Sequence, residues 1–406
     1  MGPASPQIFD VIVVGTGVIG CAVARAILQE QPNLRVCLIE KERAPALHQS
    51  GRNSGVIHVG YNQKPGTLKA RFVVEGSRQS RAFCREYNIP ITEGGILVVA
   101  TKAGRATDTL QTLLAQGRSN GAKVESVPES DIKKYEPHAV GVAALWAPEG
   151  ASFDAKAFVR VLAGQAKALG AQFIFSDPAI RLQETKADVV VQTRQQKLRA
   201  KVFVNAAGLY ADRLASQLGA GHGYKIVPFR GDYLEIVPDK RRLIRSHLYA
   251  CPDTSFPFLG VHLSRTCEGR VLLGPTASLA LGREAYGRFG FHIGECAEML
   301  LFKGFWRLCS SPVFRRLVQQ EWKKTFFRKA IVREAQRIAP ELNEKDVVPS
   351  YTGIRAQLVS AEGRLADDLV VEETPRSLHI LNAVSPALTC SLPFADYMAG
   401  QILGKL

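Results

Sequence analysis

The first forty residues contain a glycine pattern of the kind that binds phosphate groups. The hexapeptide 15–20 reads GTGVIG; it follows the β-branched run 9–14 and precedes an alanine-rich stretch, 21–29, that favours a helix. A second strand-like run, 35–39, ends in Glu40. Glycines in such a turn let backbone N–H groups and a helix N-terminus approach a pyrophosphate, and the acidic side chain accepts a hydrogen bond from a ribose hydroxyl. These spacings predict a strand–helix–strand unit that binds a dinucleotide.

Further candidate cofactor segments are spread along the chain. Residues 46–55 (ALHQSGRNSG) form a polar, glycine-rich stretch that suits a loop around an extended cofactor, which FAD requires and NAD does not. A strand-like run at 201–205 ends in small residues up to Gly208, and segments 353–355 and 382–387 are candidates to cover the ligand. We therefore predict FAD as the cofactor. The predicted cofactor residues are Gly15, Gly17, Gly20, Glu40, Lys41, Gln49, Ser50, Arg52, Asn53, Ser54, Ala179, Ala207, Gly208, Gly353, Ile354, Pro386, Ala387 and Leu388.

The composition is that of an ordinary globular protein with one exception, its charge. The 406 residues allow two or three domains, and 46% hydrophobic with 22% charged residues excludes gross disorder. Lys and Arg number 52 against 37 Asp and Glu, a net charge of +15, which is compatible with nucleic acid, an anionic membrane or acidic small molecules as partners. The eight cysteines include no C-x-x-C pair, so we expect neither a metal site nor a redox dithiol. No apolar run reaches the roughly 18 residues of a membrane span, and the first six residues show no signal peptide.

Three motifs together resemble the L-2-hydroxyglutarate dehydrogenases and oxidases, which are FAD enzymes of the D-amino-acid-oxidase-like superfamily. They are the glycine pattern 15–20, the run 48–58 (HQSGRNSGVIH) and the run 256–265 (FPFLGVHLSR). The resemblance covers residues 9 to 403, and two positions near the expected substrate, Asn62 and Cys251, depart from the family pattern. Four further stretches look like the same family: 64–70, 228–233, 351–357 and 381–387.

The resemblance implies a D-amino-acid-oxidase-like fold with a discontinuous domain organisation. A Rossmann-like α/β domain for FAD is expected to comprise residues 1–85, 150–220 and 346–406. An interleaved α+β substrate domain is expected to comprise residues 86–149 and 221–345. Within these domains we predict a helix over 153–169 and strands at 95–100, 232–237 and 269–274.

Two histidines are the candidate catalytic residues. His58 follows the loop that wraps the cofactor, and His262 lies in a glycine-containing family motif. Oxidation of a 2-hydroxy acid requires a base for the hydroxyl proton while the hydride of C2 goes to the flavin. We assign His58 as the leading general base and His262 as a substrate-binding group or second base, and the sequence leaves the order of the two open.

A dicarboxylate substrate requires cationic partners, and the planar fork of arginine pairs with a carboxylate through two hydrogen bonds. The candidates are Arg265, Arg230 and Arg355, each in one of the motifs that contain glycine. Tyr249 and Lys69 follow them as candidates for substrate binding.

The segment 297–333 combines many aromatic side chains with nine Lys or Arg and only two Glu. Its apolar residues recur at helical spacing, and a break at 310–312 predicts two helices. Two interpretations stay open. The helices pack on the substrate domain with their charges in solvent, or they form a hairpin that lies on an anionic bilayer, which would bring reduced FAD to a membrane quinone. The membrane association of the family that the chain resembles supports the second interpretation.

These features predict an enzyme that oxidises L-2-hydroxyglutarate to 2-oxoglutarate with FAD and passes the electrons to a quinone or another acceptor. The alternative is an FAD-dependent amino-acid or secondary-amine oxidase of the same superfamily. A nucleic-acid-binding scaffold is suggested by the charge alone, and no nucleic-acid-binding module supports it, so we expect no nucleic acid partner. The expected location is the cytoplasm, with peripheral contact to the inner membrane, or the mitochondrion if a transit segment has been removed.

Overall fold

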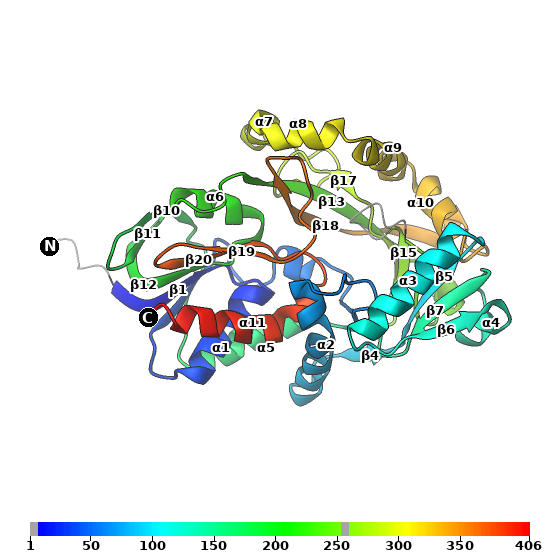
Figure 1. Cartoon of the computed structure of the whole chain (residues 1–406), viewed down its shortest axis with the longest axis horizontal. Coiled ribbons are helices and arrows are strands. Elements are labelled where there is room, and N and C mark those ends of the chain that lie inside the picture. The colour runs from blue at the N-terminus through cyan, green and yellow to red at the C-terminus, as the bar shows by residue number, and fades with distance from the viewer. Residues whose placement is uncertain (1–6, 253–259) are drawn as a thin grey trace.

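The strands predicted at the amino terminus form the centre of a sheet (Figure 1). In the computed structural model, which describes residues 7–252 and 260–406, β1 (Gln7–Val14) pairs in parallel with β2 (Val36–Ile39) on one side and β12 (Lys197–Asn205) on the other. The middle of β1 is a Val-Ile-Val run that is fully buried, as expected for a strand covered on both faces. The order of this first sheet is β10-β11-β12-β1-β2-β9, and β20 joins it beside β12 with β19 next to β20. These other strands are β9 (Gln172–Ile174), β10 (Ala179–Glu184), β11 (Val189–Thr193), β19 (Val370–Glu373) and β20 (Ser377–Asn382).

Helices cover the first sheet. On one face, the side chains of Val11 and Val13 pack with four helices in one core. On the other face, Ile12 shares a core with Leu214 of α6 (Ala211–Gln217). The four helices of the first face are α1 (Val18–Glu30), α2 (Leu68–Glu86), α5 (Ala155–Ala168) and α11 (Ala387–Leu403). The helix expected over 153–169 is therefore α5, which begins two residues later because Asp154 accepts hydrogen bonds from the first backbone N–H groups of the helix.

A second, nine-stranded sheet is built around a long antiparallel pair, β13 (Tyr224–Ile236) and β18 (Val347–Ser360). Its order is β17-β13-β16-β15-β14-β5-β7-β6, with β18 beside β13. The remaining strands of this sheet are β5 (Ile96–Ala100), β6 (Glu125–Pro128), β7 (Ala143–Ala147), β14 (His247–Ala250), β15 (His262–Arg265), β16 (Val271–Gly274) and β17 (Ser278–Leu279). A small third sheet has the order β3 (Val56–Ile57), β8 (Ala151–Phe153), β4 (Ile91–Glu93). Two further helices, α3 (Arg105–Ser119) and α4 (Ile132–Tyr135), flank β5, β6 and β7 (Figure 1).

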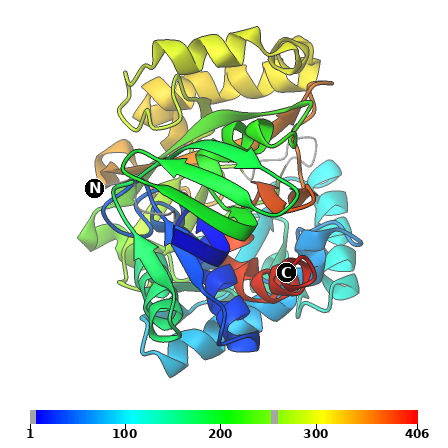
Figure 2. The same cartoon turned by 90° about the vertical axis from the view of Figure 1, so that its left-hand side faces the viewer.

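The basic segment forms four helices, so the prediction of two is wrong. They are α7 (Ile293–Leu301), α8 (Lys303–Ser310), α9 (Pro312–Phe326) and α10 (Arg328–Ala335). The predicted break is present, because the Ser311 side chain accepts from the N–H of Phe314 and a proline begins α9. Two more breaks occur at Phe302 and Phe327, which are extended and carry no glycine or proline signal. Figure 2 shows these helices in yellow and orange along the top of the molecule, away from α1 and α11. Across the described ranges, no helix combines the length and apolarity that a membrane span needs.

Candidate active site

One cavity of about 1490 Å³ connects the glycine turn of the first sheet with the β13–β18 pair of the second. At one end its wall contains Gly15 and Glu40, and at the other it contains His58, His262 and Arg355. The predicted cofactor segments and the predicted catalytic residues therefore line one and the same cavity.

The glycine turn has the geometry that close approach to a ligand requires. Gly15 has a φ of +105°, and a Cβ at this position would lie 2.4 Å from the carbonyl oxygen of Ala206. The N-terminus of α1 has no side-chain cap at Gly17, although Ser50 Oγ accepts a hydrogen bond from the N–H of Val18 at 2.9 Å. Glu40 is held at the end of β2, because it accepts hydrogen bonds from the N–H of Thr16 at 2.8 Å and from its hydroxyl at 2.7 Å.

The loop predicted to wrap the cofactor is attached to the second sheet. The hydroxyl of Tyr351 donates to the carbonyl of Asn53 at 2.7 Å, and the Arg52 guanidinium donates to the carbonyl of Thr352 at 3.3 Å. Gly353 permits this approach, since a Cβ there would lie 2.4 Å from the carbonyl oxygen of Arg52. The loop and β18 thus form adjoining walls of the same cavity.

All of the predicted cofactor residues except Gly20 line the cavity. Gly20 lies behind the turn, where a Cβ would be 1.9 Å from the carbonyl oxygen of Gly15. The third glycine of the pattern therefore serves the close packing of α1 on the turn and does not face the ligand space. A phosphate-binding turn, an acidic residue after β2 and a long cavity that continues toward the second sheet fit FAD.

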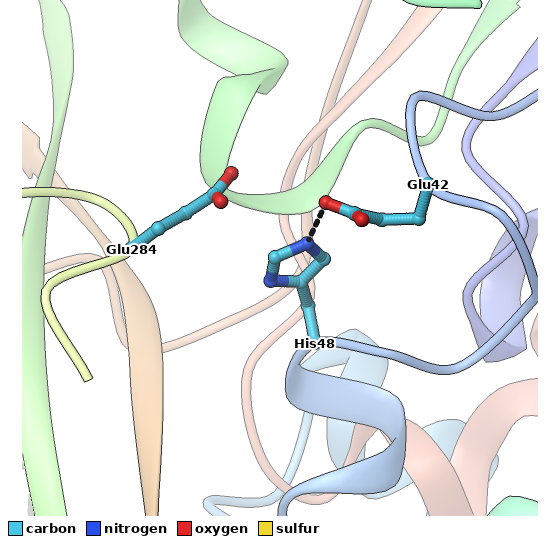
Figure 3. Close-up of side chains that lie close together, drawn as sticks. All are labelled: Glu42, His48 and Glu284. Carbon is cyan, nitrogen blue, oxygen red and sulfur yellow. Dashed lines mark hydrogen bonds and ion pairs between the residues drawn. The ribbon is translucent and has the colours of Figure 1, made fainter. Parts of the chain in front are cut away.

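A cluster of possible metal ligands lies beside the same loop. Glu42, His48 and Glu284 point toward one another, and His48 Nε2 lies 3.0 Å from a Glu42 carboxylate oxygen (Figure 3). The ammonium of Lys41 pairs with Glu42, lies 2.6 Å from Glu284 and lies 2.8 Å from His48 Nε2. Burial alone would lower the pKa of Lys41, but its hydrogen bonds to Glu284 and Glu42 outweigh burial and raise it. The cation of this cluster is therefore the lysine itself, and the cluster joins the cofactor loop to the segment that carries Glu284.

The two predicted catalytic histidines line the same cavity from different elements. His58 follows β3; its backbone N–H donates to the hydroxyl of Thr389 at 3.2 Å, and its Nε2 lies 3.4 Å from Ser385 Oγ. His262 begins β15, and its Nδ1 lies 2.9 Å from the carbonyl oxygen of Gly260. A carbonyl can only accept, so Nδ1 of His262 carries the proton and Nε2 carries the free lone pair.

Burial controls the protonation of these histidines. It lowers the pKa of His58 to about 4, with smaller contributions from the charges of His262 and Lys69. It also lowers the pKa of His262 to about 4, against a hydrogen bond to Gly260. Both rings are therefore neutral at pH 7, and each is able to accept a proton.

A third histidine, His247, was not singled out from the sequence. It is buried at the start of β14, and burial followed by the charges of His58 and His262 lowers its pKa to about 3. Its Nδ1 has no hydrogen-bond partner among the residues that the structure describes. No local signal identifies His247, because strand pairing, in particular that of β14 with β15, brings it near His262.

Of the predicted substrate-binding residues, Arg355 lines the cavity from β18. Burial lowers the pKa of Arg355 to about 10 and the charges of Asp367 and Tyr233 oppose this change, so the guanidinium is charged at pH 7. Tyr233, which the sequence analysis did not propose, also lines the cavity from β13, and burial raises its pKa to about 12. Lys69 lines the cavity as well.

Arg265 and Arg230 do not reach the cavity, which corrects two predictions. Side chains alternate along a strand, so Arg265 lies on the opposite face of β15 from His262, and its guanidinium donates to the carbonyl of Ile244 at 3.0 Å. Likewise, Arg230 alternates with the cavity residues on either side of it in β13 and pairs with Asp232 at 2.8 Å.

The other predicted substrate-side residues are divided between the cavity wall and the core. Tyr249 is buried against His262, with ring centroids 4.3 Å apart, but does not line the cavity. Asn62 lines the cavity, whereas the thiol of Cys251 lies against the carbonyl of Ala106 at 3.3 Å. The part of the second histidine motif at 256–259 lies outside the described residues.

Comparisons with known proteins agree with this geometry. A family model described as FAD dependent oxidoreductase matches residues 10–401. The chain is 36% identical over 387 residues to an L-2-hydroxyglutarate dehydrogenase of Indibacter alkaliphilus, covering 95% of this chain and 96% of the relative. It is 34% identical to the enzyme of that name from Escherichia coli strain K12 (97% and 93% covered) and 33% identical to the mitochondrial one of Bos taurus (98% and 89% covered).

Solved structures share the fold at lower sequence identity. An L-α-glycerophosphate oxidase from Mycoplasma pneumoniae with FAD bound superimposes with a TM-score of 0.77 at 22% identity, over 98% of this chain and 95% of that one. A glycine oxidase from Geobacillus kaustophilus gives a TM-score of 0.72 at 18% identity, over 98% and 94%. The predicted D-amino-acid-oxidase-like fold class and the predicted FAD cofactor are both confirmed.

Proposed function

This chain belongs to the L-2-hydroxyglutarate dehydrogenase family of FAD-dependent oxidoreductases, and from that premise we propose that it oxidises L-2-hydroxyglutarate to 2-oxoglutarate. One observation carries the proposal beyond family membership. A single cavity joins the glycine turn to two neutral histidines and to the cationic side chains of Arg355 and Lys69. A base and cations for carboxylates are the groups that oxidation of a 2-hydroxy dicarboxylate requires from the protein.

Each group of the site has a part in this reaction. When bound, FAD would be held by the glycine turn and the 46–55 loop and would supply the acceptor for the hydride of C2. Arg355 binds a carboxylate and fixes the orientation of C2, and His58 takes the proton of the C2 hydroxyl, with His262 as the second candidate for that role. Enclosure within the cavity keeps both histidines neutral and limits the access of water.

The alternative, an amino-acid or secondary-amine oxidase, fits the cavity less well. Such a substrate is bound through one carboxylate, which would leave a second buried cation without a partner. Lys69 is buried to 4% exposure in the wall of this cavity in addition to Arg355. The likeness to glycine oxidase extends only to the fold, at 18% identity.

Anaerobic reduction of the holoenzyme tests the substrate directly. L-2-hydroxyglutarate, D-2-hydroxyglutarate, L-lactate, glycine and sarcosine are added separately, and the loss of flavin absorbance is followed by stopped flow. We expect rapid bleaching by L-2-hydroxyglutarate alone, because only this compound offers two carboxylates and the matching configuration at C2. Bleaching by an amine, with none by L-2-hydroxyglutarate, would contradict the proposed function.

We further propose that helices α7–α10 contact an anionic membrane and that the electrons leave to a membrane quinone. Four aromatic residues on these helices are highly exposed: Trp306, Trp322 and Phe327 at 58% and Phe326 at 44%. The same segment carries eight exposed basic side chains, namely Lys303, Arg307, Arg315, Arg316, Lys323, Arg328, Lys329 and Arg333. Insertion of aromatic side chains between headgroups that pair with Lys and Arg is the usual arrangement of a helix lying on a bilayer.

The inward faces of the same helices support this proposal. Phe305, Leu308, Phe314 and Leu317 pack against Phe229 of β13, so the exposed aromatics are not needed for the core. Leu308, Phe314 and Leu317 also belong to the cavity wall. A membrane bound at this surface would therefore lie next to one end of the cavity, which is the position expected for a peripheral contact that receives the electrons. The inner membrane is the expected location, and the relative from Bos taurus is named as mitochondrial.

Replacing Trp306, Trp322, Phe326 and Phe327 with serine tests the membrane contact. Flotation with vesicles that contain an anionic phospholipid should show at least about a tenfold loss of bound protein, since burial of each large apolar side chain contributes on the order of 1 kcal/mol or more. Ile8, which is 45% exposed on β1 and does not line the cavity, supplies the control replacement Ile8→Ser. Equal flotation of the fourfold variant and the wild type would show that this surface is not the membrane contact.

A further inference from the structure

Lys69 is a buried cation without a counter-ion. Its side chain is 4% exposed and lies in the wall of the active-site cavity. Its backbone N–H donates to Asp368 at 2.9 Å, but its ammonium makes no hydrogen bond or ion pair with any of the described residues. An ion that is removed from water without a partner costs several kcal/mol.

The other buried cations of the chain are paired. Among the described residues, Lys69, Arg230 and Arg283 are the Lys and Arg side chains that are less than about a tenth exposed. Arg230 pairs with Asp232 at 2.8 Å, and Arg283 pairs with Asp212 at 2.6 Å. Lys69 is thus the exception, and its position in a cavity wall suggests that the missing partner is a ligand.

The local structure fixes Lys69 in this position. It lies in the first turn of α2, whose buried face continues through Phe72, Val73 and Ser80 toward α11. The carboxylate of Asp368 accepts from the backbone N–H groups of Leu68 and Lys69 at 2.8 and 2.9 Å, so this nearby acid is committed to the helix N-terminus. The backbone of Lys69 is thus held at the N-terminus of α2, with its side chain in the cavity wall.

Neighbouring charges make an anionic ligand at Lys69 favourable. Burial, together with the charge of Arg355, lowers the pKa of Lys69 to about 8, although Asp367, Asp368 and Cys390 oppose this shift. The ammonium is therefore charged at pH 7, close to a second cation and to the ring of His58, whose pKa it lowers. A ligand with two carboxylates would compensate both cations at once.

We propose that Lys69 binds the distal carboxylate of the substrate and thereby determines the preference for a dicarboxylate, an inference that rests on the proposed function. Arg355 is mounted in the middle of β18 and presents a planar fork, which suits the carboxylate beside C2, where orientation matters most. Lys69 presents a point charge on a flexible chain, which suits the carboxylate at the far end of a flexible substrate.

The experiment compares two substrates of equal length on the holoenzyme. L-2-hydroxypentanoate has the five-carbon chain of L-2-hydroxyglutarate but a methyl group in place of the distal carboxylate. For wild type, kcat/KM is expected to be at least about 100-fold higher for the dicarboxylate, as for a charged hydrogen-bonded partner in an enclosed site. Lys69→Met should remove most of this preference by lowering kcat/KM for the dicarboxylate, while kcat/KM for the monocarboxylate stays within about twofold.

Two further measurements separate binding from folding. Lys69→Arg keeps the charge and should retain a preference for the dicarboxylate of at least about tenfold. The affinity for 2-oxoglutarate, measured by calorimetry without turnover, should fall in Lys69→Met by about 100-fold, whereas the melting temperature of the ligand-free protein should stay equal or rise because an unpaired buried charge is gone.

The outcomes also separate this inference from the proposed function. If L-2-hydroxyglutarate does not reduce the wild-type flavin, the proposed function itself is wrong. If the wild type is reduced by L-2-hydroxyglutarate and Lys69→Met keeps the full preference for the dicarboxylate, the assignment of Lys69 alone is overturned.

Discussion

His58→Ala is expected to slow the reduction of the bound flavin by L-2-hydroxyglutarate by about 10²- to 10⁴-fold, the usual contribution of a general base. The ring lies in the cavity wall beyond the glycine turn, with Nε2 near Ser385, and the bond to Thr389 comes from the backbone N–H, which the variant keeps, so FAD should remain bound. Stopped-flow measurement of the anaerobic reductive step, together with the flavin content of the purified variant, checks both parts of this expectation.

Matched histidine variants identify which ring is the base. His138→Ala is the control, because His138 pairs with Glu341 at the surface and does not line the cavity. His262→Ala should have a smaller effect than His58→Ala. The reverse order would transfer the role of base to His262, and an unchanged rate in His58→Ala would rule out His58.

The pH dependence of the same step has a defined sign. Protonated His58 cannot accept the substrate proton, so the rate must fall as pH falls through the pKa of His58, which is about 4 without substrate. The charge of Lys69 contributes to this low value, and a carboxylate bound at Lys69 would reduce that contribution. The acid limb of kcat is therefore expected at higher pH than the acid limb of kcat/KM, and this separation should shrink in Lys69→Met.

From the sequence of this protein, local units such as a strand–helix–strand are easier to predict than the face of a strand on which a given side chain lies. The β1–α1–β2 unit is recognisable because the glycine turn, the buried strand and Glu40 all lie within forty residues. Arg265 and Arg230 were placed at the site because of their motifs, yet each alternates with the strand neighbours that reach the cavity. Which face of β13 or β15 looks inward depends on strand pairing, and pairing is not determined by a short motif.

Other parts of the site depend on long-range contacts. His247 lies near His262 because β14 pairs with β15, and β14 also pairs with β5, about 150 residues earlier in the chain. Lys69, in contrast, is marked by a local signal in the sequence. It lies on the apolar face of α2 with Val73 and Phe83, and a lysine on a buried face is rare and therefore conspicuous. The breaks at Phe302 and Phe327 had none, because the helical periodicity continues on both sides of each break.

Arg283→Met is expected to lower the free energy of unfolding by about 3–5 kcal/mol, the cost of leaving one member of a buried ion pair without its partner. Arg283 is 3% exposed, and its guanidinium binds both carboxylate oxygens of Asp212 at 2.6 and 2.9 Å. It also donates to the carbonyl of Leu209, so it joins the segment around residue 283 to the start of α6. Without Arg283, Asp212 would remain buried with the N–H of Ile226 as its donor at 3.1 Å.

The loss of stability should also weaken the binding of FAD, because Leu209 and Tyr210 beside this ion pair belong to the cavity wall. Urea unfolding followed by circular dichroism, and flavin fluorescence as a measure of FAD release, should therefore shift together. The double variant Arg283→Met with Asp212→Leu removes both charges and should recover most of the stability, since no buried carboxylate is left unpaired. Arg78 and Glu75 form an exposed pair at 3.9 Å, so the control Arg78→Met should cost less than about 1 kcal/mol. A single variant at Arg283 no less stable than this control would show that the ion pair does not hold α6 and the cofactor wall in place.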